Sequence, residues 1–553
     1  MKSTIIQSIV AAAFLGLTYT GHAQYTSTSR DVLTPNTGIA PAGGVTLNGT
    51  TFINRGLQGV GRVAANSTQT LDAGITETLG SISDMQITNW APTGGGNYSG
   101  TFNFLPDRGY NSGSTFSNYA ARINTFDFTF TPYTSSATTA AQNQIAMTYT
   151  GATRFSYDAD PTAGTDLRFT TGLVVTGASS VLSASVPVPV VTGSTTIGGD
   201  GGLTNRLTLD TEGLILDHRA GKAGSGWVGD EYGAHVYHFN SSKTIDGVLT
   251  LPPALVPRDG NGVNFAANTT GRRSNQGMEG IAISPDGTRL FALLQSATLQ
   301  DSASGQQTRD NTRLVIYDIS TTDTPTDPIE QYVIQLPRID DDGGSQAVRR
   351  TGAQSALLAL DNTQLLILSR DGLGRGTTGL GPVFKSVLLA DIAGAENIDG
   401  LYDAAGAAIA PGGVPLTGAS AIDPVAWTEA LNMIGKVDLG ITELEQFGLN
   451  LNGAATSDAN SISEKWEALA LVSAFDPLAP DDYFLFVGND NDFITQTGSL
   501  VQANGTTVGY NAGLENDTMV LAYRVTIVPE PGSLAMLGCA AVGLLGFRRR
   551  RQG

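Results

Sequence analysis

Three acidic motifs that lie far apart in the chain share one local pattern. Each places a glutamate before a small residue and then an apolar residue: Glu212-Gly213-Leu214, Glu279-Gly280-Ile281 and Glu467-Ala468-Leu469. If each motif lies on the innermost strand of its own sheet in a radial array, the three carboxylates converge on one centre. Converging carboxylates repel one another, so the pattern predicts a cation or an arginine at that centre. The alternative is that each glutamate caps a separate hairpin.

Two further motifs carry charged groups at turns. Asp230-Glu231 follows the strand-like Trp227-Val228, and paired carboxylates at a strand end can hold Ca²⁺ or share a proton. Asp107-Arg108-Gly109 joins a carboxylate, a guanidinium that binds phosphate through two hydrogen bonds, and a glycine that lets a ligand approach the backbone. A solvated turn for the first motif and a structural ion pair for the second remain the alternatives.

Serine and zinc hydrolase chemistry is poorly supported. The sequence has no Gly-x-Ser-x-Gly elbow and no His-Glu-x-x-His motif. Of the four histidines, His218, His235 and His238 lie near Asp230-Glu231, and a histidine beside a carboxylate can act as a general base. The alternative is that these histidines are ordinary strand or surface residues.

Charge and cysteine content exclude several classes of partner. The formal net charge is −19, from 31 Lys+Arg and 50 Asp+Glu. Such a surface repels nucleic acid and anionic lipid, whereas its carboxylates suit Ca²⁺. The one cysteine, Cys539, lies near the C-terminus, so no disulfide can stabilise the body of the protein.

The composition and turn signals predict an all-β fold. There are 68 glycines and only 15% charged residues, and Pro285-Asp286-Gly287 lies between two apolar segments as in a hairpin. No linker interrupts residues 51–525, so we expect a single large domain. Blades of roughly 50 to 80 residues would give about six or seven blades of a β-propeller. A β-solenoid is the alternative, but strict short repeats are not visible.

Both ends of the chain carry targeting signals. Residues 1–23 have a basic start, an apolar stretch and a small-residue cleavage site, which predicts a signal peptide and an exported protein. Residues 24–50 are expected to form a flexible leader. In residues 526–553, Pro529-Glu530-Pro531 precedes an apolar run and four arginines, which predicts a short hydrophobic helix and transient membrane association.

This last segment resembles a PEP-CTERM sorting tail. The resemblance implies an exosortase-type processing enzyme and a location at the surface or outer envelope of a Gram-negative bacterium, or secretion from it.

The charged motifs together resemble the phytase-like domain described as "esterase-like activity of phytase". The resemblance covers roughly residues 50–525 and rests on the segments Leu105–Asn111, Trp227–Gly233, Asn275–Gly280 and Lys465–Leu469. It implies a propeller-like fold and a possible phosphoester or ester hydrolase activity. The chain departs from the family pattern at Ser369, where a glutamate is expected before Arg370-Asp371, and at Ala468, where a glycine is expected.

From the motifs and the resemblance we predict a Ca²⁺-dependent hydrolase that acts on an anionic phosphoester or other ester. The predicted catalytic residues are Asp107, Arg108, Glu279 and Arg370. The predicted substrate-binding residues are Arg108, Arg272, Arg370 and Lys465. The predicted metal ligands are Glu212, Asp230, Glu231, Glu279 and Glu467. The alternative function is a non-catalytic surface or matrix protein that binds extracellular polysaccharide or another envelope component.

Overall fold

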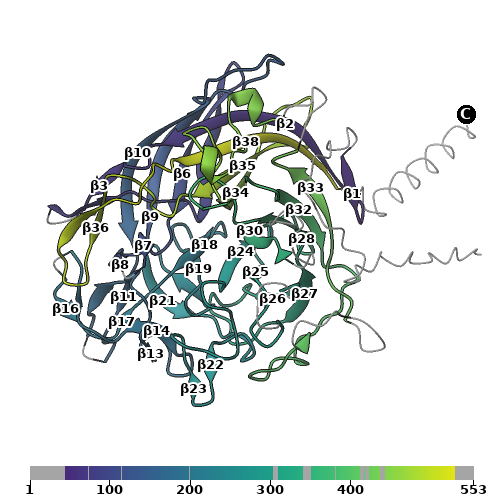
Figure 1. Ribbon diagram of the computed structural model, residues 1–553. Coiled ribbons are helices and arrows are strands. Elements are labelled where there is room, and N and C mark those ends of the chain that lie inside the picture. Colours follow the sequence, from purple (N-terminus) through teal and green to yellow (C-terminus); the bar gives the residue numbers. More distant parts are fainter. Residues whose placement is uncertain are drawn as a thin grey trace, which may run out of the picture.

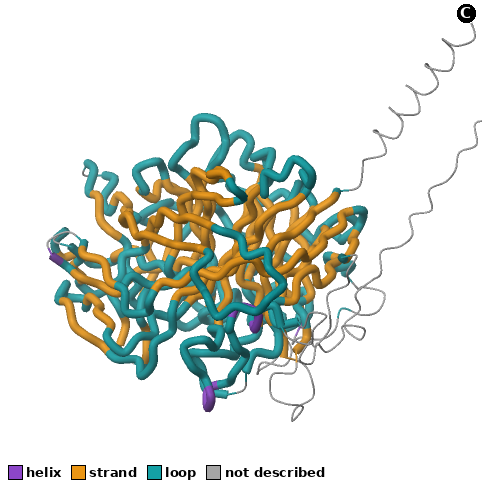
Figure 2. Tube along the Cα trace, turned by 90° about the horizontal axis from the view of Figure 1, so that it is seen from above, coloured by secondary structure: helices purple, strands orange, loops and turns teal. Residues whose placement is uncertain are grey.

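The computed structural model describes residues 44–529, with gaps at 72–73, 114, 163, 199, 303–308, 340–349, 380, 412–415, 417–421 and 436–441. Strands and loops make up this part of the chain, and its helices are short 3-10 turns such as η3 (Glu445–Phe447) and η4 (Ala454–Thr456) (Figure 2). None of the helices described here has the length and apolar character needed to cross a membrane. The expected signal peptide and the C-terminal hydrophobic helix lie outside the described residues.

Five sheets of four or more strands form the body, and we call them blades 1 to 5. Blade 1 contains β5 (Asp84–Gly94), β6 (Asn97–Leu105), β9 (Arg122–Phe130) and β10 (Ile145–Arg154). Blade 2 contains β18 (Thr211–Leu216), β19 (Gly226–Asp230), β20 (Val236–Phe239) and β21 (Thr244–Val248), with β11 (Ser156–Asp158) and β12 (Leu167–Phe169) at its edge.

The other three blades follow along the chain. Blade 3 contains β24 (Met278–Ile283), β25 (Arg289–Leu294), β26 (Asn311–Asp318) and β27 (Glu330–Gln335). Blade 4 contains β30 (Ala353–Ala359), β31 (Gln364–Arg370), β32 (Lys385–Asp391) and β33 (Ala426–Asn432). Blade 5 contains β34 (Lys465–Ser473), β35 (Asp482–Asp490), β38 (Thr518–Val528), β2 (Thr50–Val63) and β1 (Val45–Leu47).

The first strands of the blades form a closed ring. Strand β18 contacts β5 and β24, strand β30 contacts β24 and β34, and β34 contacts β5. In Figure 1, β18, β24, β30 and β34 lie near the middle of the molecule, and β10, β27 and β33 lie toward its rim. Radial sheets around a common axis define a β-propeller, so the predicted fold class is confirmed.

The described residues form five blades and not the six or seven that we expected. Our estimate divided the length of the domain by a typical blade length. Long connections invalidate that division, because residues 155–210 separate β10 from β18 and residues 392–425 separate β32 from β33. Loop length carries no periodicity that a sequence could reveal.

Short sheets of two or three strands lie in the connections within and between blades. They are β3 (Thr68–Thr70) with β4 (Thr76–Thr78), β7 (Asn111–Ser112) with β8 (Thr115–Phe116), β13 (Gly177–Ser179) with β14 (Val188–Val191) and β17 (Arg206–Leu207), β15 (Thr195–Thr196) with β16 (Gly202–Leu203), β22 (Arg258–Asp259) with β23 (Gly262–Val263), β28 (Arg338–Ile339) with β29 (Arg350–Thr351), and β36 (Gly498–Val501) with β37 (Thr507–Tyr510).

The hydrophobic core consists of layers between neighbouring blades. Each of the five largest clusters of buried apolar residues joins two adjacent blades. The cluster between blades 4 and 5, for example, contains Leu366, Trp466 and Leu521, all with no exposed surface. This packing fixes the blades relative to one another and therefore fixes the groups on their first strands.

Blade 5 closes the ring with strands from both ends of the described chain. Strand β2 pairs with β38 from Thr51↔Val528 to Val63↔Thr518. Strand β1 falls within the expected flexible leader, and β38 extends three residues into the expected tail. The folded domain therefore spans residues 45–528, slightly more than the predicted residues 51–525.

We expect Leu521→Ala to lower the free energy of unfolding by about 3 kcal/mol, because it removes a fully buried side chain between blades. Urea unfolding followed by tryptophan fluorescence measures the loss. Leu478→Ala is the matched control, since Leu478 is 94% exposed, and it should change the value by less than about 0.5 kcal/mol. Equal effects of the two substitutions would contradict the assigned core.

Candidate functional site

A β-bulge near the start of the first strand occurs in four of the five blades. In β24 the residue left without a partner across the strand pair is Glu279, and in β34 it is Glu467. Strand β18 has its bulge at Glu212-Gly213, and β30 has its bulge at Ser355. A bulge redirects a side chain that would otherwise follow the alternation of the strand. Each bulge therefore presents one polar residue at the same end of the ring.

The three glutamates of the repeated motif meet at this end, as the motif predicted. Glu212, Glu279 and Glu467 each offer a carboxylate oxygen, and these oxygens lie within 4.8 Å of one another. We call these three residues the inner group. A second set, Asp210, Glu212 and Glu231, meets the same distance limit and is called the outer group. Glu212 belongs to both groups.

All five of these carboxylates are buried, and two of their fully buried oxygens have no partner among the described residues. Glu231 and Glu279 are 2% and 1% exposed, and Glu231 Oε1 and Glu279 Oε2 accept no hydrogen bond from any described residue. The other oxygen of Glu279 accepts a hydrogen bond of 2.8 Å from Gln295 Nε2. An unpartnered buried carboxylate oxygen is costly, so these two atoms are candidates to bind a cation, a proton or a water molecule.

Arg370 neutralises part of the inner group. Its Nη2 forms an ion pair with Glu467 Oε1, and both side chains are buried. Although burial lowers the pKa of Arg370, the charges of Glu467 and Glu279 raise it above its usual value. One arginine facing three carboxylates leaves the inner group with excess negative charge.

Arg108 has the corresponding position beside the outer group. Its Nη1 lies 2.6 Å from Asp210 Oδ2, while its buried Nε has no hydrogen-bond partner among the described residues. The Asp107 carboxylate accepts a hydrogen bond from Gly109 N, which closes the turn that presents Arg108. Gly109 has φ +90°, and an added Cβ would lie 2.6 Å from Tyr119 Cβ. This turn therefore requires glycine.

A third acidic group contains its own cation. Asp107, Asp490 and Asp492 also have carboxylate oxygens within 4.8 Å of one another. Lys465 Nζ lies 2.7 Å from Asp492 Oδ1 and 3.4 Å from Asp490 Oδ2. Because lysine already neutralises this group, it has less need of a metal ion than the other two.

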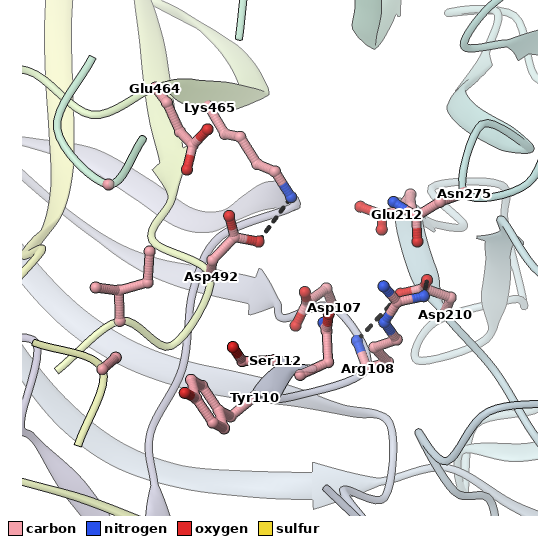
Figure 3. A pocket seen from close by; sticks show the side chains of 14 residues that line it. Asp107, Arg108, Tyr110, Ser112, Asp210, Glu212, Asn275, Glu464, Lys465 and Asp492 are labelled. Carbon is pink, nitrogen blue, oxygen red and sulfur yellow. Dashed lines mark hydrogen bonds and ion pairs between the residues drawn. The ribbon is translucent and has the colours of Figure 1, made fainter. Parts of the chain in front are cut away.

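A polar pocket of about 380 Å³ opens beside these groups. Its lining includes Asp107, Arg108, Asp210, Glu212, Lys465 and Asp492. Figure 3 shows Arg108 with Asp210 on one side of the pocket and Lys465 with Asp492 on the other. Arg370 lies instead in a separate pocket of about 310 Å³, so the predicted pair of anion-binding arginines does not share one cavity.

Burial and mutual repulsion shift the pKa values of the carboxyls. Burial raises the pKa of Glu212 and Glu279 well above the usual value, and the neighbouring carboxylates raise both further. Burial and then the charge of Asp210 raise the pKa of Glu231 to about 7. Without a cation, protons are therefore the available means of reducing the negative charge on these glutamates.

The residues present fit a hard divalent cation. Ca²⁺ binds oxygen ligands at about 2.3–2.6 Å, so two oxygens on one ion lie at most about 5 Å apart. The inner and outer groups meet this limit and offer oxygen ligands alone. Calcium or another oxygen-preferring divalent ion suits these groups better than zinc, which prefers nitrogen and sulfur ligands.

Two of the predicted site residues have structural partners instead. The Asp230 carboxylate accepts hydrogen bonds from the backbone N–H groups of Asp210, Tyr232 and Gly233, so it holds a turn and belongs to none of the three acidic groups. Arg272 donates to the carbonyl oxygens of Tyr232 and Phe265. The sequence could not reveal these contacts, because backbone partners leave no residue pattern.

The histidines lie outside both the pocket and the acidic groups. His235 is buried and its Nε2 lies 3.0 Å from the carbonyl oxygen of Pro187, and burial lowers its pKa to about 4. His238 is paired with Asp246, and His218 contacts the carbonyl oxygen of Pro285. None of the three is placed to act as a general base at the centre.

Sequence reasoning missed several residues of the site. Asp210 lies two residues before Glu212 of the first motif, and Asp490 and Asp492 flank an asparagine at the end of β35. Ser355 begins Ser355-Ala356-Leu357, which matches Glu467-Ala468-Leu469 except that serine replaces glutamate. A search that allowed any polar residue at the glutamate position would have found Ser355.

The described residues form a five-bladed propeller with an acidic centre at one end of its axis. The chain matches the family model "Esterase-like activity of phytase" over residues 79–493 and the PEP-CTERM protein-sorting motif over residues 528–551. It is 30% identical over 487 residues to an "Uncharacterized secreted protein" of Arthroderma benhamiae, which covers 81% of this chain and 89% of that protein. The chain therefore belongs to the phytase-like family.

The PEP-CTERM motif marks an exported protein and implies processing by exosortase-type sorting machinery. Both resemblances predicted from the sequence are thus confirmed.

Solved structures are similar at a lower level. The β-propeller domain of Myceliophteria thermophila Cps50 (Swd1) is 9% identical, covers 79% of this chain and 99% of that chain, and has a TM-score of 0.25. The PQQ-bound aldose sugar dehydrogenase of Streptomyces coelicolor is 10% identical, covers 88% and 100%, and has the same TM-score of 0.25. At these values neither likeness carries an argument, so the fold assignment rests on the strand topology above.

We expect the metal-free protein to be less stable at pH 8 than at pH 5. A carboxyl whose folded pKa is raised binds more protons in the folded state, so stability falls as pH rises from its unfolded to its folded pKa. The carboxyl of Glu231, with a folded pKa of about 7, by itself lowers the free energy of unfolding by roughly 3 kcal/mol between pH 5 and pH 8. Urea unfolding in EDTA at both pH values measures the loss.

Calcium should restore stability more at pH 8 than at pH 5, because the cation must displace protons at the lower pH. A stability in EDTA that rises from pH 5 to pH 8 would contradict the assigned burial of these charges.

Proposed function

We propose that this exported phytase-like protein is a divalent-cation-dependent hydrolase of phosphoric esters, with Ca²⁺ as the expected cation. The observation that carries the proposal is the pocket of about 380 Å³, which brings a positively charged group and a set of carboxylates together. One wall holds an arginine with an unpartnered buried nitrogen, and the adjoining carboxylate groups have unpartnered buried oxygens. The first suits an anionic substrate, and the second suits a cation.

Carboxylates alone would exclude a phosphate from this pocket. Asp210 and Glu212 both line it, and unit negative charges in contact repel by several kcal/mol at a partly buried site. Residues of the outer and inner groups would hold the cation. When bound, it supplies a positive charge for the phosphate oxygens and lowers the pKa of a water molecule.

The residues of the pocket wall have distinct proposed roles. Arg108 donates hydrogen bonds to the phosphate oxygens through its guanidinium. Lys465 adds positive charge from the opposite side of the pocket while it orients Asp492. Asp107, which lies on the pocket wall, gives a proton to the leaving oxygen of the ester.

Arg370 acts as a positioning residue in this proposal. Its ion pair with Glu467 fixes one carboxylate of the inner group, and its location in the second pocket keeps it away from the substrate. Arg272 and Asp230 contribute through the backbone contacts described above and have no direct part.

We also propose that the protein acts at the surface of a Gram-negative bacterium. The sorting motif begins at residue 528, at the end of β38. Strand β35 starts with Asp482 beside this end and reaches the third acidic group at Asp490. Nine residues of strand span roughly 27 Å, so the site lies far from the point where the chain continues into the sorting motif.

Purified protein should release phosphate from phytate and from p-nitrophenyl phosphate when Ca²⁺ is present, and should lose this activity in EDTA. Carboxyl esters assayed in parallel show whether the reaction extends beyond phosphoesters. Absence of turnover on all of these substrates with Ca²⁺, Mg²⁺ and Mn²⁺ would overturn the proposal and favour a binding role toward polysaccharide.

Glu279→Gln should reduce kcat/KM at least 100-fold, because it removes a charged ligand from the centre. Arg108→Gln should reduce it by a similar factor, since one charge-assisted contact to the reacting group is lost. Arg289→Gln is the control, because the Arg289–Glu330 pair lies in blade 3 away from the pocket. If Glu279→Gln or Arg108→Gln retained full activity, the proposed role of that residue would be wrong.

A further inference from the structure

The outer and inner groups are two sets of three carboxylates that share one residue. Glu212 is the common member, while Asp210 and Glu231 complete the outer group and Glu279 and Glu467 complete the inner group. The Glu212 side chain forms no hydrogen bond or ion pair with another side chain or with the backbone in the described part of the chain. A carboxylate with two oxygens can serve two cations at once.

Each group has its own unsatisfied oxygen. The unpartnered buried atom of the outer group is Glu231 Oε1, and that of the inner group is Glu279 Oε2. Both residues are more than nine-tenths buried, so bulk water does not satisfy these atoms. One cation placed in the outer group leaves Glu279 unsatisfied, and one placed in the inner group leaves Glu231 unsatisfied.

The two positions differ in their access to the pocket. Asp210 and Glu212 line the pocket, whereas Glu279 and Glu467 do not. Glu467 is also paired with Arg370, and its side chain is only 3% exposed. A cation in the outer group would therefore face a substrate, and a cation in the inner group would be enclosed by blades 2, 3 and 5.

Ser355 is a candidate for a neutral oxygen ligand at the enclosed position. It occupies in β30 the bulge position that Glu279 and Glu467 occupy in β24 and β34. The residue is 1% exposed, and its buried Oγ has no hydrogen-bond partner among the described residues. Blade 4 thus has a buried hydroxyl at the bulge position where blades 3 and 5 have a glutamate.

We propose that the centre binds two divalent cations bridged by Glu212: an exchangeable outer cation that meets the substrate, and an enclosed inner cation whose ligands include Ser355. This proposal rests on the cation-dependent function proposed above. It adds how many cations bind, which residues bind each one, and that the two cations differ in affinity and in access to the pocket. Glu212 then couples the two positions, since its carboxylate serves both.

Isothermal titration calorimetry of calcium binding to the EDTA-treated protein tests the proposal. Two calcium ions of unequal affinity are expected. Glu231→Gln should weaken the weaker step at least tenfold and leave the tighter step, whereas Ser355→Ala should weaken the tighter step at least tenfold and leave the weaker one. Glu212→Gln should weaken both steps. Glu330→Gln, a control in blade 3 away from the pocket, should leave both unchanged.

The outcomes separate the two proposals. Binding of a single calcium ion with intact activity would overturn the two-cation centre and leave the hydrolase proposal standing. No calcium binding, with no activity in calcium, would overturn both. If Glu231→Gln and Ser355→Ala weakened the same step, the positions would not be distinct and the inference would fail. Circular dichroism of each variant confirms that it remains folded.

Discussion

Repulsion among buried carboxylates on the axis is the constraint on which the rest of the site depends. At an effective dielectric constant of about 20, two unit charges about 4.8 Å apart repel by roughly 3 kcal/mol. Three charged glutamates in the inner group thus cost roughly 10 kcal/mol, which is comparable to the whole stability of a typical domain. Arg370 offsets only one of these charges. The remaining charge requires protons or cations, and a cation is the option that also attracts a phosphate.

Packing between the blades holds the carboxylates close together despite this repulsion. Apolar layers between all five pairs of blades fix the first strands, and blade 5 is closed by strands from both ends of the described chain. Bulges in four first strands then turn one polar residue each toward the same end of the ring. Because the packed blades prevent the carboxylates from moving apart, a bound cation relieves their repulsion, and this relief strengthens cation binding.

The sequence predicted the convergence of Glu212, Glu279 and Glu467 because the bulge leaves a local pattern, a glutamate followed by small and apolar residues. It did not predict Ser355, in which the same bulge carries a different residue. Asp230 was assigned to the site as half of a carboxylate pair at a strand end, and Arg272 as a counter-charge. The partners of both side chains are backbone groups that the sequence does not show. The number of blades was wrong because loops vary in length independently of the strands.

The most direct measurement is anomalous X-ray diffraction from crystals of the protein soaked in Mn²⁺, which substitutes for Ca²⁺ at oxygen sites and scatters anomalously. We predict anomalous density between the carboxylates of Glu212, Glu279 and Glu467, and within binding distance of Glu231. Density confined to surface carboxylates, with the axial glutamates hydrogen-bonded to one another through protons, would contradict a cation-binding centre.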